Sequence, residues 1–447
     1  MPEMLQRLTQ ALLDAARKAG AESADAMALD GSATSIDIRG GALEQAERSE
    51  AVEIGLRVLI AGRQACVSAS DTSLATIAAL AERAVAMARE APEDPTAGLA
   101  DPSQIARTWD LAGLELADPA EEPSAAALER DARAAESAAM AAKGITQVQA
   151  SAGYSARRVY LAASNGFSGH YARTSRSVSA VAFTGSGTGM ERDFAGEGRV
   201  FQADLPDAGG IGALAAERAL ARAGAVKPKT GHFPVLFDER IAASLVGHLL
   251  SAVNGTSIAR GASWLLDALG SQVLPKGMSI LEDPLRPRIS GSRPFDGEGL
   301  PTARRMIVRD GVLMGWTLDL ATGRKLGMAS TANAARGTSS PPSPATSNID
   351  LAPGAYSRDD LIARMGTGLL VTSLIGSTIN PTTGDYSRGA SGFWVEGGEV
   401  TFPVNECTIA GNLRDMLRSM IAANDARPHL STRVPSLLVE GLTLAGA

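Results

Sequence analysis

Apolar residues recur at two different spacings along the chain, and the spacing depends on the position. In the first half, several segments repeat apolar residues every three or four positions, which is the period of an amphipathic helix. These segments are 5–16, 73–89, 124–142 and 211–223. Other segments alternate apolar and polar residues or carry Gly-rich turns, which is typical of strands. They are 51–60 and 64–68, which form a predicted hairpin, and 145–195. The first half is therefore predicted to mix helices with strands.

The pattern breaks at Val226–Gly231, a short run with proline, lysine and glycine. We place a domain boundary there, between an N-terminal domain of residues 1–230 and a C-terminal domain of residues 231–447. After Gly270 the chain carries many short apolar segments separated by glycines, which favours a barrel or a sandwich of strands. The sequence thus predicts an α+β protein, with a mixed α/β N-terminal domain and a β-rich, barrel- or sandwich-like C-terminal domain.

One long segment of the C-terminal domain has the composition of a loop. Residues 333–344 are rich in serine, proline, alanine and threonine. Such a segment can be a flap over a cleft or a plain surface loop, and we favour the surface loop.

Composition narrows the classes of function. The net charge is −7, and a nucleic-acid binder needs a basic face, so we expect no nucleic acid as a partner. No run of 18 or more uncharged apolar residues occurs and no signal peptide is apparent, so we expect no membrane partner. Only two cysteines, Cys66 and Cys407, occur far apart, which is natural in a reducing compartment. We therefore expect a cytoplasmic protein.

The segment with the most chemical content begins the C-terminal domain. It predicts a strand at 233–237 that leads into a helix at about 238–254. Within that helix, Ala243-Ser244-Leu245-Val246-Gly247-His248 fits the frame of His-Glu-x-x-x-His. A zinc peptidase needs both histidines of that frame as ligands and the glutamate as general base. Here Ala243 and Ser244 replace the first ligand and the base, and only His248 remains.

Four further strings occur in order along the chain. They are Ser164-Asn165-Gly166-Phe167-Ser168-Gly169, Phe295-Asp296-Gly297-Glu298-Gly299, Gly384-Asp385-Tyr386-Ser387-Arg388-Gly389 and Thr408-Ile409-Ala410-Gly411-Asn412-Leu413. With the helix above, they make the sequence resemble the TldD/PmbA family, also called modulators of DNA gyrase. TldD-like chains carry the zinc motif and PmbA-like (TldE-like) chains lack it. This sequence resembles the second branch.

The resemblance implies a role in peptide hydrolysis that depends on another chain. A TldD-like catalytic chain would be the partner, as a heterodimer or a higher assembly, and a homodimer is an alternative for this chain in isolation. Zinc is expected in that partner and no cofactor in this chain. The substrates implied are unfolded peptides. Under this interpretation the degenerate positions Ala243, Ser244 and His248 leave this chain without a catalytic residue or a metal ligand set.

Two other interpretations stay open. The chain could be a zinc peptidase in its own right through His248, with Cys407 and further carboxylates, or a non-enzymatic regulator that binds peptides or proteins. As cleft-lining residues we name five polar side chains from the Gly-rich strings: Asp385, Ser387, Arg388, Thr408 and Asn412. For Asp385 and Asn412 we favour a capping role in a turn and a helix. Asp296 and Glu298 could form a carboxylate pair, although a structural role in a Gly-rich turn is favoured.

Overall fold

The N-terminal half is built on one six-stranded antiparallel sheet. The computed structural model describes residues 2–446. The strand order is β3-β2-β1-β4-β5-β6. The strands are β1 (Ser23–Arg39), β2 (Ala42–Ile60), β3 (Arg63–Ala69), β4 (Ile145–Ala163), β5 (Ser168–Thr184) and β6 (Glu191–Arg199). The predicted hairpin joins β2 to β3, and its two turn residues Ala61 and Gly62 both have positive φ. Positive φ at both positions gives the turn the twist that two neighbouring strands need.

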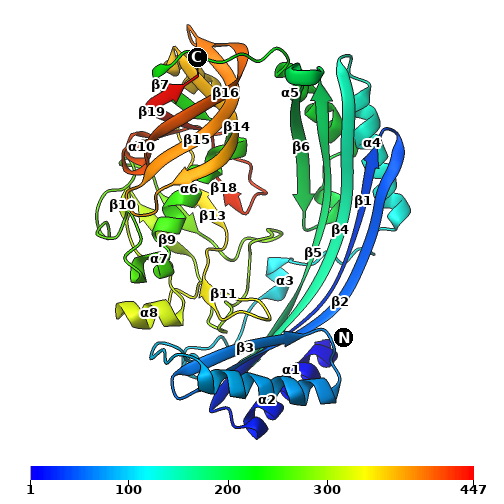
Figure 1. Cartoon of the computed structure of the whole chain (residues 1–447), viewed down its shortest axis with the longest axis vertical. Coiled ribbons are helices and arrows are strands. Elements are labelled where there is room, and N and C mark those ends of the chain that lie inside the picture. The colour runs from blue at the N-terminus through cyan, green and yellow to red at the C-terminus, as the bar shows by residue number, and fades with distance from the viewer. Residues whose placement is uncertain (1, 447) are drawn as a thin grey trace.

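Long helices cover the two ends of this long sheet. The helices of this half are α1 (Pro2–Ala19), α2 (Leu74–Glu90), α3 (Leu111–Leu114), α4 (Ala125–Met140) and α5 (Ala208–Ala221), with 3₁₀ turns η1 (Gly187–Gly189) and η2 (Gln202–Asp204). Helices α1 and α2 enclose one apolar core with the lower end of the sheet, and α4 and α5 enclose another with the upper end. The predicted mixture of helices and strands is therefore confirmed (Figure 1).

The C-terminal half contains a closed five-stranded barrel. Its strands are β7 (Gly231–Phe237), β14 (Gly368–Ile379), β15 (Asp385–Glu396), β16 (Glu399–Asn412) and β19 (Leu437–Ala445). The order is β16-β15-β14-β7-β19, and pairing of β16 with β19 closes the ring. The short β17 (Ile421–Ala422) adds to β19. Of the two predicted forms, the barrel is the one observed.

A second sheet packs beside the barrel. Its order is β10-β9-β8-β13-β18, formed by β8 (Ile280–Glu282), β9 (Arg305–Arg309), β10 (Val312–Leu313), β13 (Ile349–Leu351) and β18 (Thr432–Arg433). Strands β11 (Ala334–Ala335) and β12 (Ser343–Pro344) pair separately. The helices are α6 (Glu239–Ala252), α7 (Gly255–Ala259), α8 (Leu320–Leu326), α9 (Arg358–Met365) and α10 (Leu413–Ser419). One large apolar core joins the barrel with α6, α7, α10 and this sheet. None of the helices in residues 2–446 has the length and apolarity that a membrane crossing requires.

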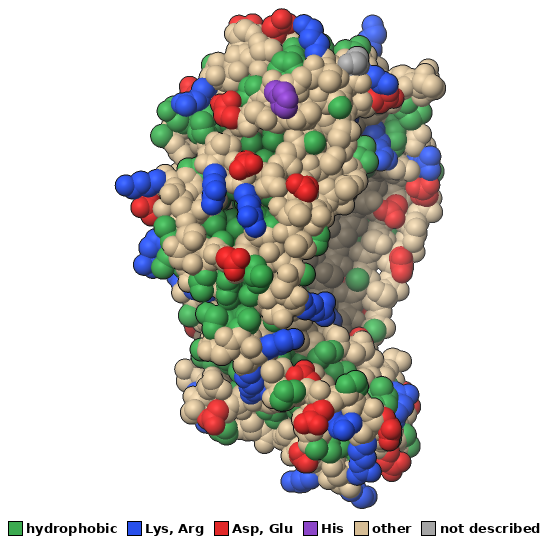
Figure 2. Space-filling model, turned by 60° about the vertical axis from the view of Figure 1, so that its left-hand side comes forward, with side chains coloured by type: hydrophobic (Ala, Val, Ile, Leu, Met, Phe, Trp, Pro, Cys, Tyr) green, Lys and Arg blue, Asp and Glu red, His purple; other side chains and the backbone are tan. Residues whose placement is uncertain are grey.

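The barrel and the long sheet stand opposite each other, and the N-terminal and C-terminal halves of the chain touch at both ends of the space between them. Figure 1 shows the barrel on one side and the curved sheet on the other, and the surface is hollowed between them (Figure 2). At one end Val226 pairs with Val404 of the barrel. At the other end Phe295 packs edge-on against Phe167, with ring centroids 5.0 Å apart. The predicted boundary at residue 230 lies in the segment that connects α5 with β7, and it stays a prediction.

The segment 333–344 is not a plain surface loop. The Arg336 side chain is fully buried and pairs with Asp25 of β1, which also pairs with the buried Arg57. The backbone of Thr338 lies so close to β2 that a Cβ on Gly55 would stand 2.2 Å from the Thr338 carbonyl oxygen. The segment is held against the sheet although its composition is that of a loop, because the buried Asp25 carboxylate needs charged partners and Arg336 supplies one of them.

Candidate functional site

Helix α6 begins directly after the barrel strand β7. Asp238 caps its N-terminus, because its carboxylate accepts a hydrogen bond from the Arg240 N–H. The buried stripe on its other face packs into the barrel core, and consists of Ala242, Leu245, Val246, Leu249 and Ala252. The predicted helix is confirmed. An added Cβ at Gly247 would meet nothing within 4 Å, so close packing does not require glycine there.

Two of the three degenerate motif positions share a face of α6. Ser244 and His248 are one helical turn apart, so their side chains share a face. The His248 ring meets the Tyr386 ring of β15 edge-on, with centroids 5.8 Å apart and an interplanar angle of 71°. The Ser244 Oγ and the His248 Nε2 are both buried and have no hydrogen-bond partner among the described residues. Tyr386 is 2% exposed, and its hydroxyl likewise makes no hydrogen bond of good geometry there.

Arg388 is the charged neighbour of this group. It lies two residues after Tyr386 on β15, so both side chains share one face of the strand. Its Nε donates a 2.7 Å hydrogen bond to the carbonyl oxygen of Gly376 on β14. Burial, and then the charge of Arg388, lower the pKa of His248, so the imidazole is neutral near pH 7. Burial raises the pKa of Tyr386 to about 12, although the positive charge of Arg388 by itself lowers this pKa.

These residues do not fit a zinc ion. Structural and catalytic zinc sites take three or four ligands from Cys, His, Asp and Glu. Residues 2–446 contain no group of three or more such side chains placed to hold a metal. The Cys407 thiol donates to the carbonyl oxygen of Ala390 at 3.1 Å, and burial raises the pKa of this thiol to about 11, so it stays protonated. The guanidinium of Arg388 adds a fixed positive charge beside His248, which opposes binding of a cation.

The five predicted cleft residues do not form one group. Asp385 and Asn412 bond to each other, and Ser387 and Arg388 lie on opposite faces of β15. Asp385 and Asn412 are cross-strand partners, and the Asn412 Nδ2 donates to the Asp385 carboxylate at 3.1 Å. Asn412 also caps α10 by accepting from the Arg414 N–H, so the capping role is observed for Asn412. Ser387 alternates with Arg388 along β15 and therefore points to the opposite face. Of the five, Arg388 is the one that neighbours His248. That Asp385, Ser387, Thr408 and Asn412 line a cleft stays a prediction.

Comparison with known proteins places this site in a family. Three domains described for PmbA/TldA metallopeptidases match: domain 1 at residues 24–88, the central domain at 118–223 and the C-terminal domain at 230–446. The metalloprotease PmbA of Escherichia coli O157:H7 is 37% identical over 414 residues, which cover 92% of this chain and 90% of that protein. The chain belongs to the PmbA/TldD family. A PmbA homologue of Haemophilus influenzae is 35% identical over 449 residues, covering 99% of this chain and 96% of that protein.

Solved structures agree with the family. A Bacteroides thetaiotaomicron protein named for modulation of DNA gyrase superposes with a TM-score of 0.92 at 28% identity, and covers 99% of both chains. TldE from Thermococcus kodakarensis superposes with a TM-score of 0.85 at 20% identity, covering 98% of this chain and 100% of that one, which shows the fold alone.

The acidic pair of this PmbA/TldD chain is structural. Asp296 accepts hydrogen bonds from the backbone N–H groups of Glu298, Leu300 and Ala334. Glu298 accepts one from the N–H of Leu320 at the start of α8. Both carboxyl groups are buried, and burial raises the pKa of each. They hold together neighbouring turns of the C-terminal half, which is the structural role that the sequence favoured.

Sequence reasoning missed Tyr386 as a neighbour of the motif helix. Strand alternation in Gly384–Gly389 could have paired Tyr386 with Arg388 on one face. That this face meets His248 depends on the closure of the barrel, which no local signal in the PmbA/TldD sequence reveals.

Proposed function

We propose that this chain is the PmbA/TldE-like, non-metal subunit of a cytoplasmic metallopeptidase complex. In that complex a TldD-like chain supplies the zinc ion and the general base and hydrolyses unfolded peptides. The observation that carries the proposal is the group on α6, where Ala243 and Ser244 stand at the ligand and base positions. The neutral His248 there faces Tyr386 and the positive Arg388 rather than further ligands.

At the position where the zinc motif has its general base, this chain carries Ser244. A serine hydroxyl such as that of Ser244 is a poor base near neutral pH because its proton is not released there. Cleavage in the proposed complex therefore depends on the partner's glutamate. The proposed role of this chain is to complete the enclosure around the substrate and to help hold it.

The long sheet offers an edge suited to an extended peptide. Strand β3 pairs with β2 only from Ile54 to Ile60, so the preceding part of β2 has no strand on its outer side among the described residues. Residues Ala42–Ala51 of that part are exposed. An extended peptide can add to such an edge through backbone hydrogen bonds, independently of its sequence. This supports binding of unfolded substrates in the proposed complex.

Reconstitution with a TldD-like chain tests the proposal. Each chain alone should leave an unfolded peptide uncut, and the mixture should cut it. Replacing the glutamate of the partner's zinc motif by glutamine should abolish cleavage, whereas Ser244→Ala in this chain should leave the rate within about twofold, because the hydroxyl takes no part in the reaction. Loss of cleavage on Ser244→Ala would contradict the proposal.

Metal content provides an independent measurement. The chain purified alone without a metal-binding tag should hold close to no zinc by elemental analysis. A ratio near one zinc per chain that disappears on His248→Ala would instead show that this chain carries its own metal site.

A further inference from the structure

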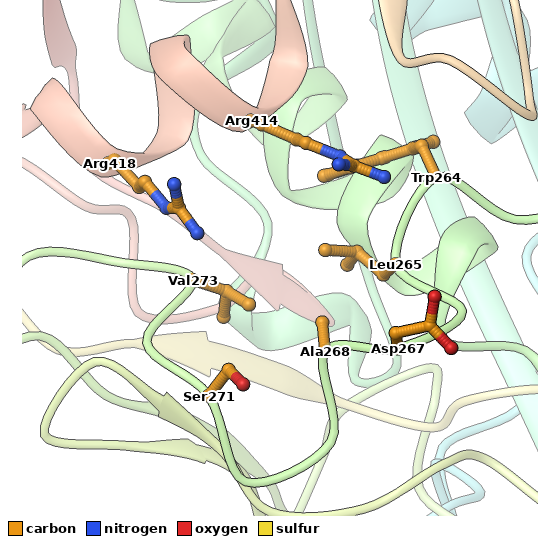
Figure 3. Close-up of a pocket in the computed structure, with 8 residues that line it drawn as sticks. All are labelled: Trp264, Leu265, Asp267, Ala268, Ser271, Val273, Arg414 and Arg418. Atoms are coloured by element: carbon orange, nitrogen blue, oxygen red, sulfur yellow. The ribbon is translucent and has the colours of Figure 1, made fainter.

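A small pocket opens beside α10. It has a volume of about 170 Å³. Eight residues line it: Trp264, Leu265, Asp267, Ala268, Ser271, Val273, Arg414 and Arg418. Figure 3 shows the two arginines reaching over the pocket from α10, with Asp267 and Ser271 on the opposite rim and apolar side chains between them.

The two arginines have no counter-ion. Arg414 and Arg418 are one turn apart on α10 and both are exposed. Neither guanidinium makes an ion pair or a hydrogen bond with another described residue, whereas Arg286 and Arg288, for example, each pair with a carboxylate. Asp267 is the acidic residue of the lining, so the pocket keeps one net positive charge in a chain whose net charge is −7. Two unpaired guanidiniums at one pocket favour an anionic ligand, and their planar forks match a carboxylate.

The size and lining of the pocket select a single side chain. Sites for whole cofactors or drug-sized ligands are usually about 300–1,000 Å³, so a pocket of 170 Å³ suits one residue of a larger molecule. The backbone at its apolar wall is held in place, because the backbone N–H of Trp264 donates to the Pro381 carbonyl oxygen at 2.8 Å. The Trp264 ring also lies 3.3 Å from where a Cβ on Gly384 would stand. Leu266 and Leu269 beside it are 38% and 43% exposed and extend the apolar surface.

We infer that this pocket binds the C-terminal residue of a polypeptide. The terminal carboxylate lies between Arg414 and Arg418, and an apolar side chain of that residue enters the pocket over Leu265 and Val273. The backbone N–H of the same residue donates to Asp267 on the opposite rim. A C-terminal residue supplies an anion, an apolar group and an N–H donor together, which is the set of groups that this lining complements.

The pocket lies outside the hollow between the barrel and the sheet. Helix α10 is on the side of the barrel away from β1–β6 (Figure 1). A chain end held there is therefore accessible without entering the hollow. The C-terminus can belong to a free peptide or to a folded protein, and the same chemistry recognises both.

Fluorescence polarisation with short labelled peptides tests the inference on the full chain alone. The probe is a Gly-Gly-Leu peptide labelled at its N-terminus, with a free C-terminal carboxylate. It should bind saturably, and binding should weaken as salt is added because the guanidiniums are exposed. The same peptide with an amidated C-terminus, and a peptide that ends in lysine, should each bind at least about tenfold more weakly than the Leu peptide. Each of them loses one group that the pocket recognises.

Variants assign the binding to the pocket. Arg414→Gln with Arg418→Gln should weaken binding of the Leu peptide by at least about tenfold. The matched control is Arg7→Gln with Arg83→Gln, which removes the same charge from exposed positions on α1 and α2 and should leave binding unchanged. Equal loss in both double variants, equal binding of the amide, or no saturable binding would each overturn the inference.

A competition experiment distinguishes a free peptide from a folded protein as the ligand. A stable folded protein that ends in Gly-Gly-Leu on a flexible tail should compete with the labelled peptide if folded proteins are recognised. Competition by the free peptide alone restricts the site to peptides and still supports the inference. Because all of these measurements use this chain without a catalytic partner, their outcome is independent of the proposed function.

Discussion

Replacing Glu298 by glutamine should remove a large part of the pH dependence of the protein's stability. Burial, and then the charge of Asp296, raise the pKa of Glu298 to about 8, whereas a glutamate in the unfolded chain has a pKa of about 4.3. Between these values the folded state holds a proton that the unfolded state has released. The free energy of unfolding then falls by up to about 1.4 kcal/mol per pH unit. The contribution is fully present below about pH 4 and is lost as the pH rises through about 8.

The magnitude follows from this interval. From about pH 6 to about pH 8 the wild-type protein should lose roughly 2–3 kcal/mol through Glu298. Glutamine releases no proton, and its carbonyl oxygen can still accept the hydrogen bond from the Leu320 N–H. The variant should therefore become more stable relative to wild type as the pH rises.

Urea denaturation of both proteins across this pH range measures the effect. The exposed Glu90→Gln on α2 is the matched control, and its stability should follow wild type at every pH. If the difference between wild type and Glu298→Gln is the same at every pH, the carboxyl is not held protonated in the folded state and the reasoning is refuted.

Four further variants test the helix packing and the charge at the motif. Gly247→Ala should raise the free energy of unfolding by about 0.5–1 kcal/mol, because the new methyl meets open space within a helix. Gly212→Ala should lower it by about 1–3 kcal/mol, because its Cβ would stand 1.9 Å from the Ala135 carbonyl oxygen; equal effects in urea denaturation would contradict this. Ala243→His with Ser244→Glu should still bind little zinc by elemental analysis, and adding Arg388→Gln should increase the zinc content because a repelling charge is removed. Full zinc binding by the double variant would show that Arg388 does not oppose the metal.

The local parts of the fold could be predicted from the sequence. The apolar stripe of α6 and its capping residue Asp238 predict the helix and its start, because helix period and capping depend only on residues close together in the sequence. The short strands with glycine turns likewise indicated a barrel or a sandwich. Choosing between them required the pairing of β16 with β19, which joins Thr408 to Ala445 and has no local signature.

Long-range contacts explain what could not be predicted. Residues 42–51 are exposed throughout and show no alternation of burial, since β2 is held there by its pairing with β1. The burial of Arg336 depends on Asp25, more than three hundred residues earlier in the chain. The contact of His248 with Tyr386 likewise joins a helix to a distant strand. The motif positions were therefore visible in the sequence, but their neighbours were not.

The pairing of β1 with β4 in the six-stranded sheet affects the order of folding during synthesis. Strand β1 pairs along its length with β4, from Asp25 opposite Ala163 to Arg39 opposite Gln149. At roughly 5–20 residues per second, a ribosome completes β4 several seconds after α2 has emerged. During that time one edge of β1 stays open to other nascent chains. Its charged residues Asp25, Asp30, Asp37 and Arg39 are of the type that discourages such pairing, so they can protect the chain before the sheet is complete.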